Sequence, residues 1–215
     1  MDMEWYIVWD YRAAILDGLS LTLQLSIIAI IGSTIIGTMV GCLSTLPSFY
    51  LQKITGVYVE TLRNMPVVVK LFFMHFIIGV DAFPAGIIAL VLHQSSYIAD
   101  VTAAGLRSVP HGQTEVARSC GHGYFQLFRY ILVPQAIRYV IPPMTTQYIQ
   151  TIKNSAVVML IALEDLTFMT QKIEHETFRG FEAATAVTIM YLLVVLVIAV
   201  TMTLLQKYLE RKLPA

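Results

Sequence analysis

The chain has 215 residues, of which 57% are hydrophobic and only 13% are charged, and its mean hydropathy is +0.70. Soluble domains are about one quarter charged, so this composition excludes an ordinary soluble globule and favours a protein embedded in a bilayer. Acidic and basic residues balance to a net charge of zero, which excludes a global basic field for nucleic acid.

Five segments are predicted to cross the membrane, because a spanning helix needs roughly 20 mostly apolar residues. The middle three carry charged residues, and the fourth has an expected break at Pro142 and Pro143. The predicted spans are residues 19–46, 57–79, 83–108, 134–163 and 183–207. The sequence therefore predicts an all-α integral membrane protein that forms one domain over residues 1–215.

Basic residues in the loops predict the orientation of the chain. An outer amino terminus places one large basic set at or near the cytoplasmic side and a smaller set outside. The cytoplasmic set is Lys53, Arg63, Arg107, Arg118, Arg129, Arg138, Lys207, Arg211 and Lys212, and the outer set is Arg12, Lys172 and Arg179. The amino terminus is therefore predicted outside and the carboxyl terminus inside. The acidic flank that begins at Asp2 argues against a cleavable signal peptide.

A long cytoplasmic loop is predicted over residues 109–133, and an acidic outer loop over residues 164–181. Gly121 is expected to divide the cytoplasmic loop into two short helices, and Pro134 suits the first turn of the next helix. The residues alone leave two interpretations open. The loop could form a surface amphipathic helix at the membrane interface or a docking helix for a partner.

The cytoplasmic loop resembles the EAA loop of ABC-transporter permeases, in which Glu-Ala-Ala is followed by Gly and then by Ile-x-Leu-Pro. The matching positions are Glu115, Ala117, Gly121, Ile131 and Pro134, with Val116 and Val133 as mild apolar departures. Other motifs resemble the polar-amino-acid branch of that family, and the resemblance extends from about Gly18 to Leu213. These motifs are Glu60 to Pro66, Ser96 to Asp100, Gly112-Gln113 and Lys153 to Ser155.

The resemblance implies the permease subunit of a type I importer in the bacterial inner membrane. The EAA loop would form coupling helices against two ATPase subunits, which would carry ATP and Mg²⁺, with no cofactor on this chain. The implied coupling residues are Glu115, Ala117, Gly121, Phe125 and Pro134. The resemblance also implies a second permease subunit, either the same or a sister chain, and a periplasmic or lipoprotein substrate-binding protein outside.

Charged residues inside the predicted spans are candidates for function, because a charge within a bilayer is costly. Arg63 and Asp100 reach matching depths in neighbouring spans, and Glu60 lies close to them in the sequence. Three interpretations stay open for Arg63 and Asp100: a structural ion pair, a gate, or no contact. The family often carries a basic residue three positions after the acid, where this chain has Ala103.

Lys70 and Lys153 lie deep in their spans without an obvious acidic partner in the neighbouring spans. The family more often shows Gln at the position of Lys70. The sequence leaves three roles open for Lys70: extension to the outer interface, contact with a substrate carboxylate, or pairing with Glu164 or Asp165.

Asn154 bears on the choice of substrate. Relatives that move cationic amino acids tend to carry Asp at this position, so the resemblance favours glutamate, aspartate or glutamine here. The candidate residues of the substrate path are Arg63, Pro66, Lys70, Asp100, Lys153, Asn154 and Ser155.

Three small residues in the first span, Ser33, Gly37 and Gly41, predict close approach of another helix. His75 and His93 are single histidines within spans, for which packing or a hydrogen bond is expected rather than a proton relay.

The sequence has no phosphate-binding loop, zinc-binding His-Glu-x2-His or nucleophile elbow. Two rivals to the permease are an intramembrane enzyme, with His111 and Glu115 or Asp100 as acid and base, and a passive channel. An ATPase that copurifies through the cytoplasmic loop would favour the permease.

Overall fold

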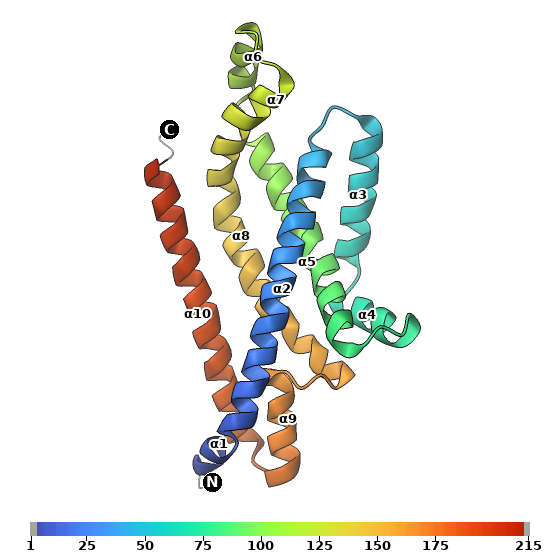
Figure 1. The fold of residues 1–215 in the computed structure, drawn as a ribbon, viewed down its shortest axis with the longest axis vertical. Helices are drawn as coiled ribbons and strands as arrows, with labels where there is room; N and C mark the ends of the chain where they lie inside the picture. The colour runs from blue at the N-terminus through green and yellow to red at the C-terminus, as the bar shows by residue number, and fades with distance from the viewer. Residues whose placement is uncertain (1–3, 213–215) are drawn as a thin grey trace.

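The computed structural model describes residues 4–212, so Asp2 and Leu213 lie outside the described part of the chain. Helices account for nearly all of it, and the long ones run side by side along the long axis of the molecule, whereas α4 (Val67–Phe72) lies across it (Figure 1). They are α1 (Tyr6–Asp10), α2 (Arg12–Ser44), α3 (Phe49–Asn64), α4 (Val67–Phe72), the π-helix η1 (Phe73–Ile77), α5 (Ala82–Arg107), α6 (His111–Ser119), α7 (Tyr124–Leu127), the π-helix η2 (Phe128–Leu132), α8 (Val133–Ser155), the 3₁₀-helix η3 (Ala156–Ile161), α9 (Leu166–Thr177) and α10 (Gly180–Lys212). The predicted all-α class is confirmed.

Three helices are long and apolar enough to cross a membrane: α2, α5 and the part of α10 over Gly180–Leu209. Large apolar side chains also point away from the protein along α2 and α10. They include Ile27, Ile31, Ile35 and Met39 on α2 and Leu192, Leu196, Val197, Val200 and Leu204 on α10. Exposed apolar surface of this extent suits contact with lipid rather than water.

The second and fourth predicted spans are built differently from single straight helices. The second is divided at Met65 and Pro66, because the residue before a proline avoids helical backbone and Met65 is extended (φ −99°, ψ 123°). In the fourth, the expected break at Pro142 and Pro143 does not occur, and α8 continues through both prolines. The chain tightens instead into η3 and turns at Ala162, whose φ is +56°.

The core centres on the packing of α2 against α5. A Cβ atom on Gly37 would lie 2.7 Å from the Ser95 carbonyl oxygen, and one on Gly41 would lie 2.6 Å from the Ala99 carbonyl oxygen. The glycines therefore allow backbone contact between the two helices, as the small residues of the first span predicted.

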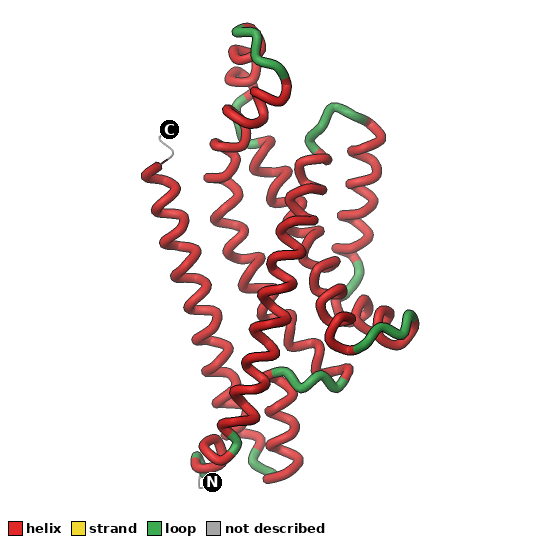
Figure 2. The backbone as a smooth tube through the Cα atoms, viewed as in Figure 1, coloured by secondary structure: helices red, strands yellow, loops and turns green. Residues whose placement is uncertain are grey.

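The remaining elements gather at the two ends of the bundle. Helices α6 and α7 and the carboxyl end of α10 lie toward one end, whereas α1 and α9 lie at the other (Figure 1). Short loops connect the helices, and one of them separates α3 from α4 (Figure 2).

Candidate functional site

The loop over residues 109–133, predicted to be cytoplasmic, contains two short helices, α6 and α7, that project from the bundle (Figure 1). Gly121 separates α6 from α7 with a φ of +83°, a conformation that glycine adopts without strain, so the predicted division is confirmed. Ala117 is buried, Glu115 is exposed, and the Phe125 side chain is 76% exposed. Pro134 lies in the first turn of α8, as predicted. The projecting helices thus present a carboxylate and an unpartnered aromatic ring.

Four polar residues follow one face of α5 at intervals of three, four or seven residues: His93, Tyr97, Asp100 and Arg107. This spacing places them in a row along the helix. Each of them lines one of two polar cavities, and Tyr97 lines both. Tyr97 therefore stands between the two cavities on this face of α5.

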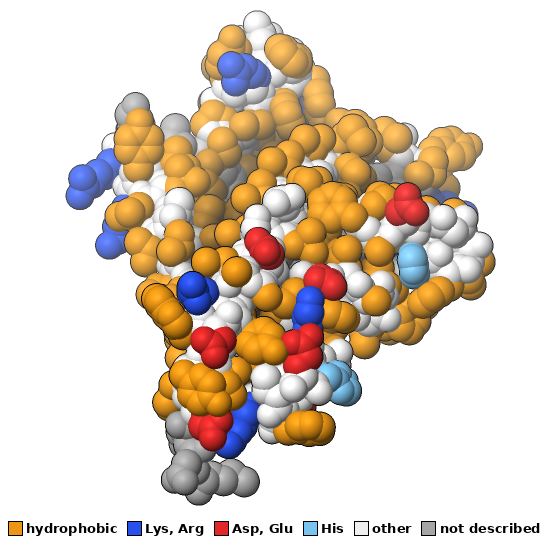
Figure 3. Space-filling view, turned by 60° about the horizontal axis from the view of Figure 1, so that its bottom comes forward, with side chains coloured by type: hydrophobic (Ala, Val, Ile, Leu, Met, Phe, Trp, Pro, Cys, Tyr) orange, Lys and Arg blue, Asp and Glu red, His pale blue; other side chains and the backbone are white. Residues whose placement is uncertain are grey.

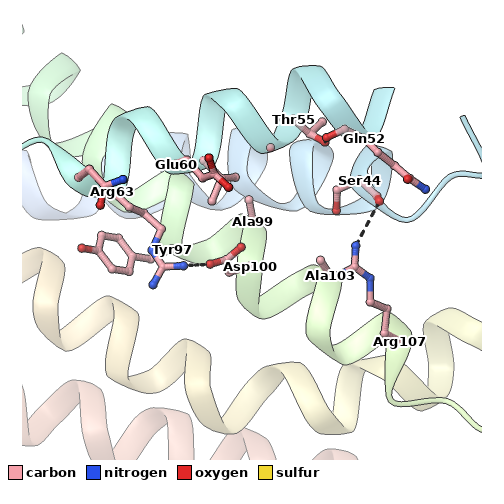
Figure 4. Close-up of a pocket in the computed structure, with 13 residues that line it drawn as sticks. Ser44, Gln52, Thr55, Glu60, Arg63, Tyr97, Ala99, Asp100, Ala103 and Arg107 are labelled. Atoms are coloured by element: carbon pink, nitrogen blue, oxygen red, sulfur yellow. Dashed lines mark hydrogen bonds and ion pairs between the residues drawn. The ribbon is translucent and has the colours of Figure 1, made fainter. Parts of the chain in front are cut away.

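The first cavity lies between α3 and α5 and has a volume of about 550 Å³. Arg63 donates to the Asp100 carboxylate, and its guanidinium lies 5.0 Å from the Tyr97 ring centroid (Figure 4). Glu60 lines the same cavity, and Arg107 donates to the Ser44 carbonyl oxygen at 3.4 Å. Of the interpretations left open by the sequence, the structure contains the ion pair. The two side chains are 44% and 45% exposed, so the pair lies in a wet cavity.

The second cavity lies between α5 and α8 and has a volume of about 300 Å³. Its lining is polar and rich in amides: His93, Gln94, Tyr97, Thr146, Gln147, Gln150 and Asn154. The Gln94 amide donates to Gln147 Oε1 at 2.6 Å. Within residues 4–212 the Gln147 NH₂ group has no partner, so it can donate into the cavity. We call this space the amide cavity.

Of the residues that line the amide cavity, only Asn154 was predicted from the sequence as a substrate-path residue. The signal was present in the spacing of α8, where Gln147, Gln150 and Asn154 recur every three or four residues. Neutral amides cost less than charges within a bilayer, so their depth in the span did not mark them as candidates.

Lys70 is buried, with only 3% of its surface exposed. Its Nζ donates to the carbonyl oxygens of Leu62 at 2.5 Å and Met65 at 2.9 Å, and it lies 2.9 Å from His93 Nδ1. Pro66, which has no N–H, leaves the Leu62 carbonyl without its helical donor, and the lysine supplies one. Lys70 therefore neither extends to the outer interface nor contacts Glu164 or Asp165.

The other predicted residues of α8 point in different directions. Asn154 lines the amide cavity, Ser155 is buried and donates to the Ile152 carbonyl oxygen at 2.7 Å, and Lys153 is exposed. Lys153 has no ion-pair partner in the part of the chain that the structure describes. Its charge is directed away from the helix bundle of this subunit.

The opposite end of the molecule is held together by polar contacts to α9. The buried Asp165 carboxylate accepts from the Phe168 backbone N–H at 2.9 Å and from the Tyr191 hydroxyl at 3.2 Å. The Leu166 N–H donates to Thr22 Oγ1 at 3.0 Å. Burial raises the pKa of the Asp165 carboxyl, and the hydrogen bonds from Phe168 and its other neighbours partly oppose that rise.

An ion-pair group at this end joins the beginning of the described chain to α10. Arg179 contacts Glu4 at 2.7 Å and Glu182 at 3.9 Å. Acidic and basic side chains lie here among exposed apolar ones (Figure 3).

Comparisons with known proteins assign the chain to a family. The family described as "Binding-protein-dependent transport system inner membrane component" matches residues 18–214. The chain belongs to this family. The permease is 33% identical to the "Probable glutamine ABC transporter permease protein GlnM" of Bacillus subtilis (strain 168), with 95% of this chain and 97% of that protein covered. It is 27% identical to the "Glutamine transport system permease protein GlnP" of Escherichia coli (strain K12), with 96% and 98% covered.

Its fold matches that of a solved amino acid ABC transporter, described as "with histidines", at a TM-score of 0.88 and 28% identity. The match covers 97% of this chain and all of the other. The chain is therefore an amino acid ABC transporter permease subunit, a transport component whose family relies on a separate ATPase.

Proposed function

We propose that this permease carries glutamine across the inner membrane through the amide cavity. The single observation that carries the proposal is the amide-lined cavity between α5 and α8, in a chain that belongs to the amino acid permeases. Amide groups offer both donors and acceptors, so they complement the donor and acceptor of a glutamine side chain. No lysine, arginine, aspartate or glutamate lines this cavity.

The proposed topology has five membrane crossings within a single domain. Helices α2, α5, α8 and α10 each cross once, and α3 and α4 together form the remaining crossing. The topology places α1 and α9 outside, and α6, α7 and the carboxyl end of α10 in the cytoplasm. The arrangement of these elements at opposite ends of the bundle supports this topology (Figure 1). The excess of basic residues at the α6–α7 end supports the same orientation.

Glutamine is favoured over the other amino acids that the sequence left open. Asn154 contributes a neutral amide to the cavity, whereas a carboxylate there would suit a cationic substrate. The printed names of two similar permeases, from Bacillus subtilis and Escherichia coli, also specify glutamine. Glutamate and aspartate are less well matched because the lining offers them no fixed cation.

Coupling to ATP hydrolysis is proposed to occur through α6 and α7. Glu115 would pair with basic groups of an ATPase, Phe125 would insert into an apolar pocket there, and Gly121 would permit close backbone approach. Ala117 and Pro134 would hold these residues in place from the body of the permease. Two ATPase subunits would bind ATP and Mg²⁺, and their association would draw two permease loops together.

Two further partners complete the proposed importer. A second permease, either a copy or a sister chain, would face the exposed Lys153 across a shared path, since an intramembrane cation needs water or a partner. A substrate-binding protein would dock outside on α9 and the amino-terminal segment, where Phe178 is 90% exposed. The rival enzyme is not supported, because His111 and Glu115 are both exposed on α6.

The test is uptake of labelled glutamine by proteoliposomes that contain the complete importer, with ATP inside. Unlabelled glutamine should abolish the signal, whereas arginine at the same concentration should leave it almost unchanged. Asn154→Asp introduces a negative charge in a side chain of the same size and should reduce the maximal rate of glutamine uptake. The control is Gln52→Glu, which makes the same change at the edge of the first cavity. Equal uptake by Asn154→Asp and the unmodified importer would contradict the proposed path.

A further inference from the structure

The contact between Lys70 and His93 connects the break in the second span to the amide cavity. Lys70 lies on α4 and is not part of the cavity lining, whereas His93 lies on α5 and lines the cavity. Neither residue was expected to contact the other from the sequence. Their contact, 2.9 Å between Nζ and Nδ1, determines which chemical group His93 presents to the cavity.

The Lys70 ammonium has three N–H donors and three acceptors around it. Two acceptors are the carbonyl oxygens of Leu62 and Met65, at the end of α3, and the third is His93 Nδ1. The carboxyl end of a helix favours a cation. In water, the pKa of an imidazolium is about four units below that of a lysine ammonium. The proton therefore stays on Lys70, and His93 is neutral.

A nitrogen that accepts from an ammonium cannot itself carry a hydrogen in the same direction. His93 Nδ1 is consequently the unprotonated nitrogen, and the hydrogen of the neutral ring lies on Nε2. Among residues 4–212, no group bonds to His93 Nε2, and the ring packs edge-on against Tyr97 with centroids 5.2 Å apart. The histidine thus has an N–H donor that no group of the described chain accepts, and the residue lines the amide cavity.

We infer that Lys70 is a positioning residue that fixes the tautomer of His93, and that His93 Nε2–H is a specificity-determining donor to an oxygen of the transported amino acid. This inference rests on the proposed function, since it takes the amide cavity as the substrate path. The ligand is an amino acid whose side chain carries a neutral oxygen acceptor, as that of glutamine does. The nearby Lys70 charge acts against arginine and lysine side chains.

Two substitutions at His93 separate its role as an N–H donor from its contact with Lys70. Asparagine can still accept from Lys70 but is too short to present a donor at the position of Nε2. Glutamine is longer and places an amide N–H near that position. Loss of one neutral hydrogen bond reduces a rate by about threefold to tenfold. We therefore expect His93→Asn to lower the maximal rate of glutamine uptake by that factor, and His93→Gln to remain close to the unmodified importer.

A merely structural role for His93 predicts a different pattern. His93→Asn would then transport normally because the Lys70 contact is kept, and that outcome would overturn the inference. An equal loss of transport in His93→Asn and His93→Gln would overturn it as well, since the donor would not be the decisive group.

The tautomer is measured directly by nitrogen-15 NMR of the complete importer labelled at histidine, with the His93 signal assigned by its absence in His93→Asn. We expect protonated Nε2 and unprotonated Nδ1 at pH 7. Lys70→Gln keeps a donor toward Nδ1 and should preserve this spectrum, whereas Lys70→Met removes the donor and should populate the other tautomer. A charged ring, or protonated Nδ1 in the unmodified protein, would overturn the inference.

The two measurements also separate this inference from the proposed function. Absence of glutamine uptake by the unmodified importer would overturn the proposed substrate, while the NMR spectrum would still decide whether Lys70 fixes the tautomer. Uptake with the wrong tautomer would retain the function and overturn the role of Lys70.

Discussion

The two ends of this permease differ in how many of their side chains find partners within the chain. At the α1–α9 end, Asp165, Thr22 and Tyr191 bond to one another or to nearby backbone, and Arg179 bridges two glutamates. At the α6–α7 end, the apolar side chains of Phe125 and Val116 are 76% and 65% exposed. The polar groups named at the α1–α9 end are therefore paired within the chain, whereas α6 and α7 project from the bundle with large apolar side chains exposed (Figure 1).

This difference shows where substitutions should affect stability and where they should affect assembly. Changes at the α1–α9 end remove internal bonds of the folded subunit. Changes on α6 and α7 leave the folded subunit intact and alter what can dock on it.

The largest expected effect comes from Gly121→Asp, which places a carboxylate at the turn between the projecting helices. A charge buried in an interface without a partner costs several kcal/mol, so copurification of the ATPase should fall by more than about tenfold. The control is Gly121→Asn, because asparagine has the same size and tolerates positive φ without adding charge. Equal losses in the two variants would attribute the defect to shape rather than charge.

The next effect is expected at the α1–α9 end. Asp165→Ala removes the cap of α9 and the acceptor for Tyr191, and should cost about 1–2 kcal/mol of folding stability. The thermal unfolding midpoint in detergent should fall, while ATPase copurification stays normal among the folded molecules. Asp165→Asn keeps an acceptor oxygen and should lose less. A selective loss of ATPase binding would contradict the division between the two ends.

The Arg63–Asp100 pair should show a smaller effect because both side chains are half exposed. Ion pairs in such surroundings contribute about 0–1 kcal/mol. Arg63→Ala should lower thermal stability slightly more than the double substitution with Asp100→Ala, since the single change leaves a charge unpaired. If the double variant equals the sum of the two single ones, the pair contributes nothing.

The smallest effect is a pH dependence at Asp165. Burial raises the pKa of this carboxyl in the folded state, so the folded state disfavours its ionisation. The stability that this shift contributes is present below the unfolded pKa of about 4 and is lost as pH rises through the folded pKa. The unmodified protein should therefore gain stability relative to Asp165→Asn between pH 7 and pH 4, measured by unfolding midpoints. A difference that stays constant over this range would contradict the shift.

Parts of the site followed from the sequence because they depend on local rules. The positive φ of Gly121 and the placement of Pro134 in the first turn of α8 reflect backbone chemistry that can be read from residue types. Lys70 was different. Its partners, two carbonyls and His93, come from the break at Pro66 and from another helix, and no rule of sequence spacing connects positions 70 and 93.

The sequence by itself determined the helical class, the family and the division of the loop at Gly121 into two short helices, because each depends on composition or on motifs of short range. The tertiary structure decided which polar groups meet. It joined α5 and α8 into an amide cavity, placed Lys70 against His93, and turned Lys153 away from this subunit's bundle. Those outcomes depend on helix packing, in which a contact as close as that of Gly37 with Ser95 sets the register of everything on the same helix.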